Sequence, residues 1–70
     1  MDDLEALIGR VRAEYREMPG LSLTTLQAAR LWGMHLSVCE MVLEELVLRG
    51  VLYNTPNGGY AAAPPTRERV

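Results

Sequence analysis

Lysine is absent from this 70-residue sequence, and all seven basic residues are arginines. The formal net charge is −2, and residues 1–60 carry five arginines against eight acids, which leaves about −3 there. Proteins that bind nucleic acid through its phosphates usually carry a basic surface patch. The charge balance therefore counts against nucleic-acid binding, whatever fold the chain adopts.

Cysteine is nearly absent as well, since Cys39 is the single one in the chain. One thiol cannot form an internal disulfide, which excludes a small secreted scaffold held together by disulfides. No apolar stretch approaches the length of a membrane span, and the N-terminus lacks the basic and apolar regions of a signal peptide. We therefore expect a cytoplasmic protein that is not associated with a membrane.

Catalytic and metal-binding patterns are also missing. The sequence has no nucleophile paired with a base, no glycine-rich phosphate loop and no cluster of metal ligands. A chain this short also has little room for a closed pocket. The sequence thus predicts a protein that is not an enzyme, that uses no metal or cofactor and that has no small-molecule substrate.

Helical periodicity is the strongest pattern that is present. Apolar residues recur at steps of three and four over residues 3–18, which predicts a helix with one apolar face. Asp2 and Glu5 have the spacing of a capping box, which would satisfy free N–H groups at the start of this helix. Pro19 followed by Gly20 predicts its end.

A second, shorter helix is predicted to begin at Thr24. Gln27 lies three residues later and completes a capping-box pattern. Gly33 predicts the end of this helix, because glycine accepts the left-handed conformation that closes a last helical turn.

A third helix is predicted to begin at Ser37, which with Glu40 forms another capping-box pattern. It is expected to continue to Arg49, with Gly50 closing it. Glu45 lies four residues before Arg49, which is the spacing of a favourable ion pair on a helix.

The remaining segments indicate a small amount of sheet. Residues 51–53 and 60–63 are predicted strands of a hairpin, joined by the turn-forming residues 55–59. Residues 21–23 alternate apolar and polar side chains, so they are a candidate for a further minor strand. Residues 64–70 begin with two prolines and are expected to form a flexible C-terminal tail.

The junction between the second and third predicted helices resembles the helix-turn-helix motif of bacterial transcriptional regulators. Ala29 is small enough to let the two helices approach closely, and Gly33 permits the sharp turn between them. Cys39 and Val42 are expected to face inward and fix the crossing. The Arg-Gly-Val-Leu segment at 49–52, followed by a glycine-rich hairpin, resembles the winged variety. The alternative is a plain three-helix bundle with a disordered tail.

The resemblance implies a mainly α fold, with three helices and a small β-hairpin, that forms a single winged helix-turn-helix domain over residues 1–63. In such domains the third helix enters the major groove of double-stranded DNA. The resemblance therefore implies a transcriptional-regulator type of DNA-binding domain that acts as a dimer. The candidate nucleic-acid contacts are Thr24, Thr25, Gln27, Arg30, His35, Ser37, Met41 and Asn57.

A second function fits the side chains of the third helix better than DNA binding does. Val38, Met41 and Leu48 are expected to lie beside Glu45, nearly opposite the core-facing side, and to form an apolar partner interface. The alternative function is therefore a winged helix that binds protein, either another chain or a second copy of itself. A positive face of Arg10, Arg12, Arg16 or Arg30 beside the third helix would favour DNA, and a neutral or negative face would favour a protein partner.

Three residues have both a functional and a structural interpretation. His35 has no other metal-ligand types at the right spacing, which favours a turn residue over a metal ligand. Cys39 is expected to be an inert core thiol rather than a redox sensor. Trp32 is expected to anchor the core rather than to stack on a ligand.

Overall fold

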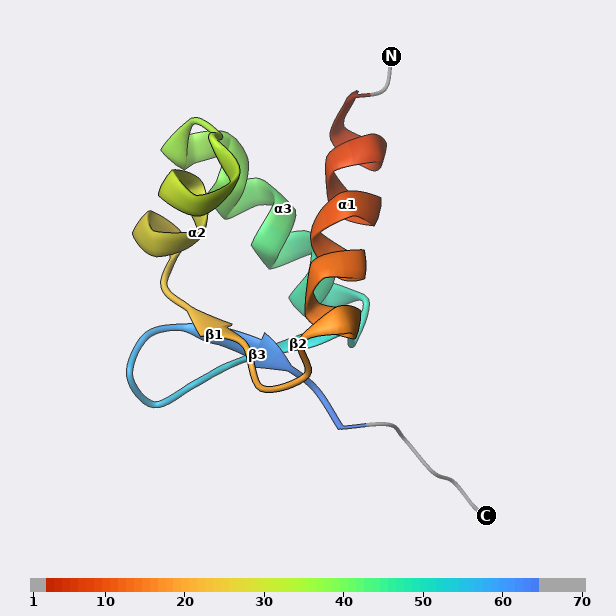
Figure 1. The fold of residues 1–70 in the computed structure, drawn as a ribbon, viewed down its shortest axis with the longest axis vertical. Helices are drawn as coiled ribbons and strands as arrows, with labels where there is room; N and C mark the ends of the chain where they lie inside the picture. Colours follow the sequence, from red (N-terminus) through yellow and green to blue (C-terminus); the bar gives the residue numbers. More distant parts are fainter. Residues whose placement is uncertain (1–2, 65–70) are drawn as a thin grey trace.

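Three helices and a three-stranded antiparallel sheet form a winged helix-like arrangement, as predicted (Figure 1). The structure, a computed structural model, describes residues 3–64. Helices α1 and α2 lie on either side of α3, and the sheet lies across one end of the three helices (Figure 1). The elements in chain order are α1 (Asp3–Glu17), β1 (Ser22–Leu23), α2 (Thr25–Trp32), α3 (Leu36–Leu48), β2 (Leu52–Asn54) and β3 (Tyr60–Ala62).

Helix α1 has the apolar face that its periodicity predicts. Ile8, Val11 and Tyr15 are buried at successive steps of three and four residues. The helix ends before the Pro-Gly pair, and the N–H of Leu21 donates to the carbonyl of Met18 as the chain turns. The predicted N-terminal cap at residue 2 and the predicted tail beyond residue 64 lie outside the described residues.

Helix α2 begins with the predicted capping box. The N–H of Gln27 donates to Oγ1 of Thr24 over 3.2 Å, and the N–H of Thr24 donates to Oε1 of Gln27 over 2.9 Å. At the other end, Gly33 has a φ of 65°, and the N–H of Met34 donates to the carbonyl of Ala29. Because a Cβ at Gly33 would meet no atom within 4 Å, the glycine is required for its backbone conformation and not for space.

Helix α3 begins earlier than its sequence pattern indicates, so the predicted Ser37–Glu40 capping box is wrong. The N-cap is His35, whose carbonyl accepts the N–H of Cys39, and no side chain caps the helix. Ser37 lies inside the first turn. The earlier start shortens the connection after Gly33, and both Ala29 and Cys39 belong to the buried core cluster.

Helix α3 ends close to the predicted position, with Arg49 as its C-cap and Gly50 in the left-handed region. The N–H of Gly50 donates to the carbonyl of Val47, and the N–H of Val51 donates to that of Leu46. This pair of bonds satisfies carbonyls that the end of the helix would otherwise leave free. Because the N–H of Val51 donates to the end of the helix, it is not free to pair in the sheet, and β2 starts one residue later than predicted.

The sheet has the order β1-β3-β2, so the predicted minor strand exists and pairs with β3 rather than with its neighbour in sequence. The hairpin turn closes with a hydrogen bond from the N–H of Gly58 to the carbonyl of Thr55, at a φ of 83° for Gly58. A Cβ at Gly59 would lie 3.1 Å from the carbonyl oxygen of Leu23. That glycine therefore lets the turn pass close to β1.

A single core joins the three helices to the sheet. The rings of Tyr15 and Trp32 meet edge to face with centroids 6.1 Å apart, and the hydroxyl of Tyr15 donates to the carbonyl of Tyr60 over 2.9 Å. Burial raises the pKa of Tyr15 to about 12, helped by nearby Cys39 and Tyr60. The buried hydrophobic residues are Ile8, Val11, Tyr15, Ala28, Ala29, Trp32, Cys39, Val42, Leu43, Leu46, Leu52 and Tyr60.

Candidate interaction surface

The two sides of α3 differ sharply in their surroundings. The inner face, formed by Cys39, Val42, Leu43 and Leu46, has no exposed area. The outer face is the exposed side of the same helix. It consists of Ser37, Glu40, Met41, Glu44 and Leu48. Four of these residues follow the i, i+4, i+7, i+11 spacing of one stripe along a helix.

Two large apolar side chains are open to solvent on the outer face. Met41 is 54% exposed and Leu48 is 81% exposed. They lie two helical turns apart, with Glu44 between them; the hydroxyl of Tyr60 donates to Glu44 over 3.4 Å. The outer face is therefore an apolar stripe interrupted and flanked by carboxylates.

The predicted partner interface is wrong in the placement of Val38. This side chain is half-buried and packs against the core. It lies one helical turn before the buried Val42 and therefore leans inward rather than away from the core. Glu45 also lies beside the outer face rather than on it, and its carboxylate accepts a hydrogen bond from Arg49 over 2.9 Å. Of the four predicted interface residues, the outer face brings together Met41 and Leu48.

The first turn of α2 offers less to a phosphate than its sequence indicates. Thr24 and Gln27 bond to each other in the capping box, so the Thr24 hydroxyl already accepts one N–H group. Thr25 is half-buried. Arg30, in the last turn of the same helix, is exposed and carries the only positive charge of α2.

The other predicted DNA contacts are exposed but belong to separate elements. His35 and Ser37 lie at the start of α3, whose first N–H groups receive no side-chain cap. Asn57 lies in the turn between β2 and β3. The structure therefore keeps His35 and Ser37 together at the start of α3 and places Asn57 in the separate hairpin turn.

The charge of α3 is entirely negative within its helical residues, which include three glutamates and no base. Arg49 follows the helix, but it donates to Glu5 over 2.8 Å and to Glu45 over 2.9 Å. The hydrogen bond that Arg49 donates to Glu5, followed by the one that it donates to Glu45, raises the pKa of Arg49. The nearest arginine is thus held by carboxylates of α1 and α3 and adds little free positive charge to the outer face.

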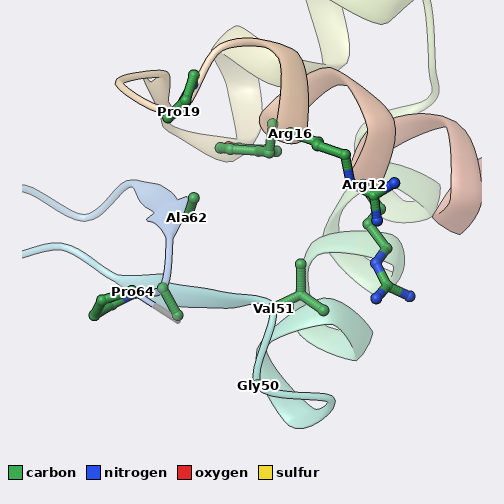
Figure 2. Close-up of a pocket in the computed structure, with 9 residues that line it drawn as sticks. Arg12, Arg16, Pro19, Gly50, Val51, Ala62 and Pro64 are labelled. Carbon is green, nitrogen blue, oxygen red and sulfur yellow. The ribbon is translucent and has the colours of Figure 1, made fainter. Parts of the chain in front are cut away.

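Two arginines of α1 take part in a different feature, an open groove of about 500 Å³ (Figure 2). Arg12 and Arg16 lie one turn apart on α1. Residues 50–51, before β2, and residues 62–64, at and after the end of β3, face them across the groove. We refer to this feature as the arginine groove. It is lined by Arg12, Tyr15, Arg16, Pro19, Gly50, Val51, Ala62, Ala63 and Pro64.

The arginine groove was not predicted from the sequence. The four-residue spacing of Arg12 and Arg16 indicates that both lie on one side of a helix. The opposite wall comes from residues 50–51 and 62–64, far along the chain, and the antiparallel pairing of β3 brings it into place. These two arginines line the groove and are not among the residues of the outer face.

Neither a metal site nor a membrane helix is found in the part of the chain that the structure describes. Residues 3–64 contain no group of three metal-ligating side chains. Within the same residues, none of the helices combines the length and apolar composition that a membrane crossing requires. Comparison of the chain with known protein families, curated proteins and solved structures finds no match.

Proposed function

We propose that this winged helix is a protein-binding module that docks through the outer face of α3. The observation that carries the proposal is the exposure of Met41 and Leu48 on a helix with three glutamates and no base. Exposed apolar side chains rimmed by charged ones are typical of protein interaction sites. A DNA-reading helix would instead need to approach a polyanion, and Glu40 and Glu44 oppose that approach.

The chemistry of the outer face also defines the kind of partner. Burying Met41 and Leu48 requires an apolar strip on the partner, and a thioether side chain adapts well to an irregular surface. The carboxylates of Glu40 and Glu44 favour basic residues beside that strip, since complementary charge orients a complex and speeds its formation. A basic amphipathic helix of another protein meets both requirements.

Double-stranded DNA is the second candidate partner, and a separate observation favours it. The N-terminus of α3 has no side-chain cap, and exposed His35 and Ser37 flank its first N–H groups. Free N–H groups at a helix N-terminus are suited to a phosphate oxygen. Arg30 of α2 is a further exposed residue able to contact the backbone. In this version the protein is a small regulator that binds DNA, acting as a dimer.

Both versions of the proposal describe a cytoplasmic protein that binds a partner and catalyses no reaction. Cys39 is a free, buried thiol, which is usual in a reducing compartment. The described residues include no nucleophile aligned with a base by a hydrogen bond.

The test is a pair of titrations of the whole chain, followed by NMR. The first adds a synthetic basic amphipathic helical peptide, and a peptide of the same apolar pattern with acids in place of its bases is the control. The second adds random-sequence duplex DNA at low and moderate salt. We expect the basic peptide to shift the amide signals of the outer face and the acidic peptide to leave them unchanged.

DNA binding that weakens steeply with salt, centred on His35 and Ser37, would overturn the protein-binding proposal and support the second candidate. Light scattering in the same buffers reports whether the chain associates with itself. Self-association that is lost when Leu48 is replaced by serine would identify a second copy as the protein partner.

A further inference from the structure

We propose that the arginine groove is a binding site for a small amphiphilic anion, with a carboxylate or phosphate head group and a short apolar body. This inference concerns a set of residues that does not overlap with the outer face of α3, and it does not depend on the function proposed there. It rests on the charge at one rim of the groove, the apolar character of the other and the volume between them.

The charged rim consists of Arg12 and Arg16. Both are exposed, and neither forms an ion pair with another residue between positions 3 and 64. Like charges four residues apart on a helix repel one another and destabilise it slightly. An oxyanion between the two guanidinium groups would relieve this repulsion and accept several charge-assisted hydrogen bonds. Figure 2 shows both side chains extending from α1 on the same side of the groove.

The opposite wall has no charge to compete for such an anion. Its side chains are those of Val51, Ala62, Ala63 and Pro64, and none of the acidic residues between positions 3 and 64 lines the groove. The backbone adds few free polar groups, since the N–H of Val51 donates to Leu46 and its carbonyl accepts the N–H of Ala63. A bound molecule must therefore place its polar atoms at the arginines and its apolar atoms along this wall.

The dimensions of the groove limit the size of the ligand. A volume of about 500 Å³ is within the range of small-molecule sites, which run from about 300 to 1,000 Å³. The groove is open along one side, so it suits a short alkyl or aryl chain lying on the wall rather than a fully enclosed molecule. A nucleotide is a poorer fit, because its sugar and base need polar partners that the apolar wall does not provide.

The experiment measures binding of straight-chain acids to the whole chain by NMR titration. Acetate, butyrate and hexanoate test the apolar wall, hexanamide tests the need for charge, and hexyl phosphate and inorganic phosphate distinguish the two head groups. We expect hexanoate to shift the amide signals of the groove and hexanamide to leave them unchanged. Affinity should rise with chain length by up to about fourfold for each methylene that becomes buried.

Matched substitutions locate the site. Arg12→Gln and Arg16→Gln each remove one charge from an exposed position, and Arg10→Gln and Arg30→Gln remove one elsewhere. The groove variants should weaken hexanoate binding at least about tenfold, which is the loss of one charge-assisted hydrogen bond of about 1.4 kcal/mol. The other two variants should bind as the wild type does.

Three results would overturn the inference, and none requires any variant to fold. One is equal binding of hexanoate and hexanamide by the wild type. Another is an affinity that does not change from acetate to hexanoate. The third is a set of shifted signals on the outer face of α3, which would assign the anion to a different surface. Failure of this experiment leaves the peptide titration of the outer face unaffected, so the two proposals fail separately.

Discussion

The inner and outer faces of α3 are built from one continuous helix, yet different physical demands have shaped them. On the inner face, Leu43 and Leu46 have no exposed area, and each contacts side chains of the common core. On the outer face, Met41 and Leu48 are more than half exposed and contribute little to the stability of the domain. Folding therefore explains the apolar residues on one side only. Those on the other side require a different explanation, and binding is the one we propose.

The largest effect should follow from removing volume on the inner face. Leu43→Ala deletes buried methyl groups from a close-packed core, and such changes typically cost 2–5 kcal/mol of unfolding free energy. A chain of 70 residues forms a small core with a thin margin of stability, so that loss should leave a substantial unfolded fraction at room temperature. Urea denaturation followed by circular dichroism measures it, with Leu48→Ala as the matched change on the outer face. Equal losses in the two variants would remove the distinction between the faces.

The next effect concerns the hydroxyl of Tyr15, whose ring is buried in the core. Tyr15→Phe removes the hydrogen bond from Tyr15 to the carbonyl of Tyr60 and keeps the ring packed on Trp32. Loss of a buried hydrogen bond of this kind should cost about 1–2 kcal/mol. A loss below about 0.3 kcal/mol would mean that packing, rather than the hydrogen bond, joins α1 to β3.

The same hydroxyl makes stability depend on pH in alkali. The pKa of Tyr15 is raised from 10.0 in the unfolded chain to about 12, chiefly by burial, so folding favours its neutral form. Its contribution is complete below pH 10 and is lost between pH 10 and about 12, to a total of about 2–3 kcal/mol. Burial raises the pKa of Cys39 as well, in the same direction. Comparison of wild type with Tyr15→Phe across this range isolates the tyrosine, and parallel curves would contradict the assignment.

The contrast between the faces also explains what the sequence could and could not predict. The helix over residues 3–18 and the cap at Thr24 depend on side chains close together in the chain, and both predictions were confirmed. Val38 was misplaced because a position about 90° from the centre of the buried face can be either covered or exposed, and only the packing of the other elements against α3 decides which. The arginine groove depends on residues some 50 positions apart, so no local pattern indicates it.

The start of α3 allows a sharper test, since the sequence indicated two hydroxyl side chains, those of Thr24 and Ser37, as helix caps. Thr24→Ala breaks an observed capping box and should cost about 1 kcal/mol. Ser37→Ala should change stability by less than about 0.5 kcal/mol, because Ser37 lies within the helix and caps nothing. Thermal denaturation of both variants gives the comparison directly. If Ser37→Ala cost as much as Thr24→Ala, α3 would begin at Ser37 in solution.

Substitutions on the outer face should have the smallest effect on the free energy of unfolding. An unchanged stability is informative there, because any loss of binding can then be assigned to the surface itself. Met41→Ser and Leu48→Ser replace exposed side chains, so each should change the unfolding free energy by less than about 0.5 kcal/mol. Such a loss is too small to reduce binding by unfolding the domain. If the outer face docks a partner, the same two variants should lose most of their affinity for the basic peptide, since apolar anchors at the centre of an interface carry most of its energy.

Glu40→Gln is the companion change, because it keeps the shape of the outer face and removes one charge from its rim. It should slow association and reduce its dependence on salt while leaving dissociation nearly unchanged, which surface plasmon resonance resolves. A peptide that binds Met41→Ser and Leu48→Ser as tightly as wild type would show that the exposed apolar side chains are not the contact. In that case binding would not explain why Met41 and Leu48 are exposed. The uncapped N-terminus of α3 would then become the better candidate for the binding site.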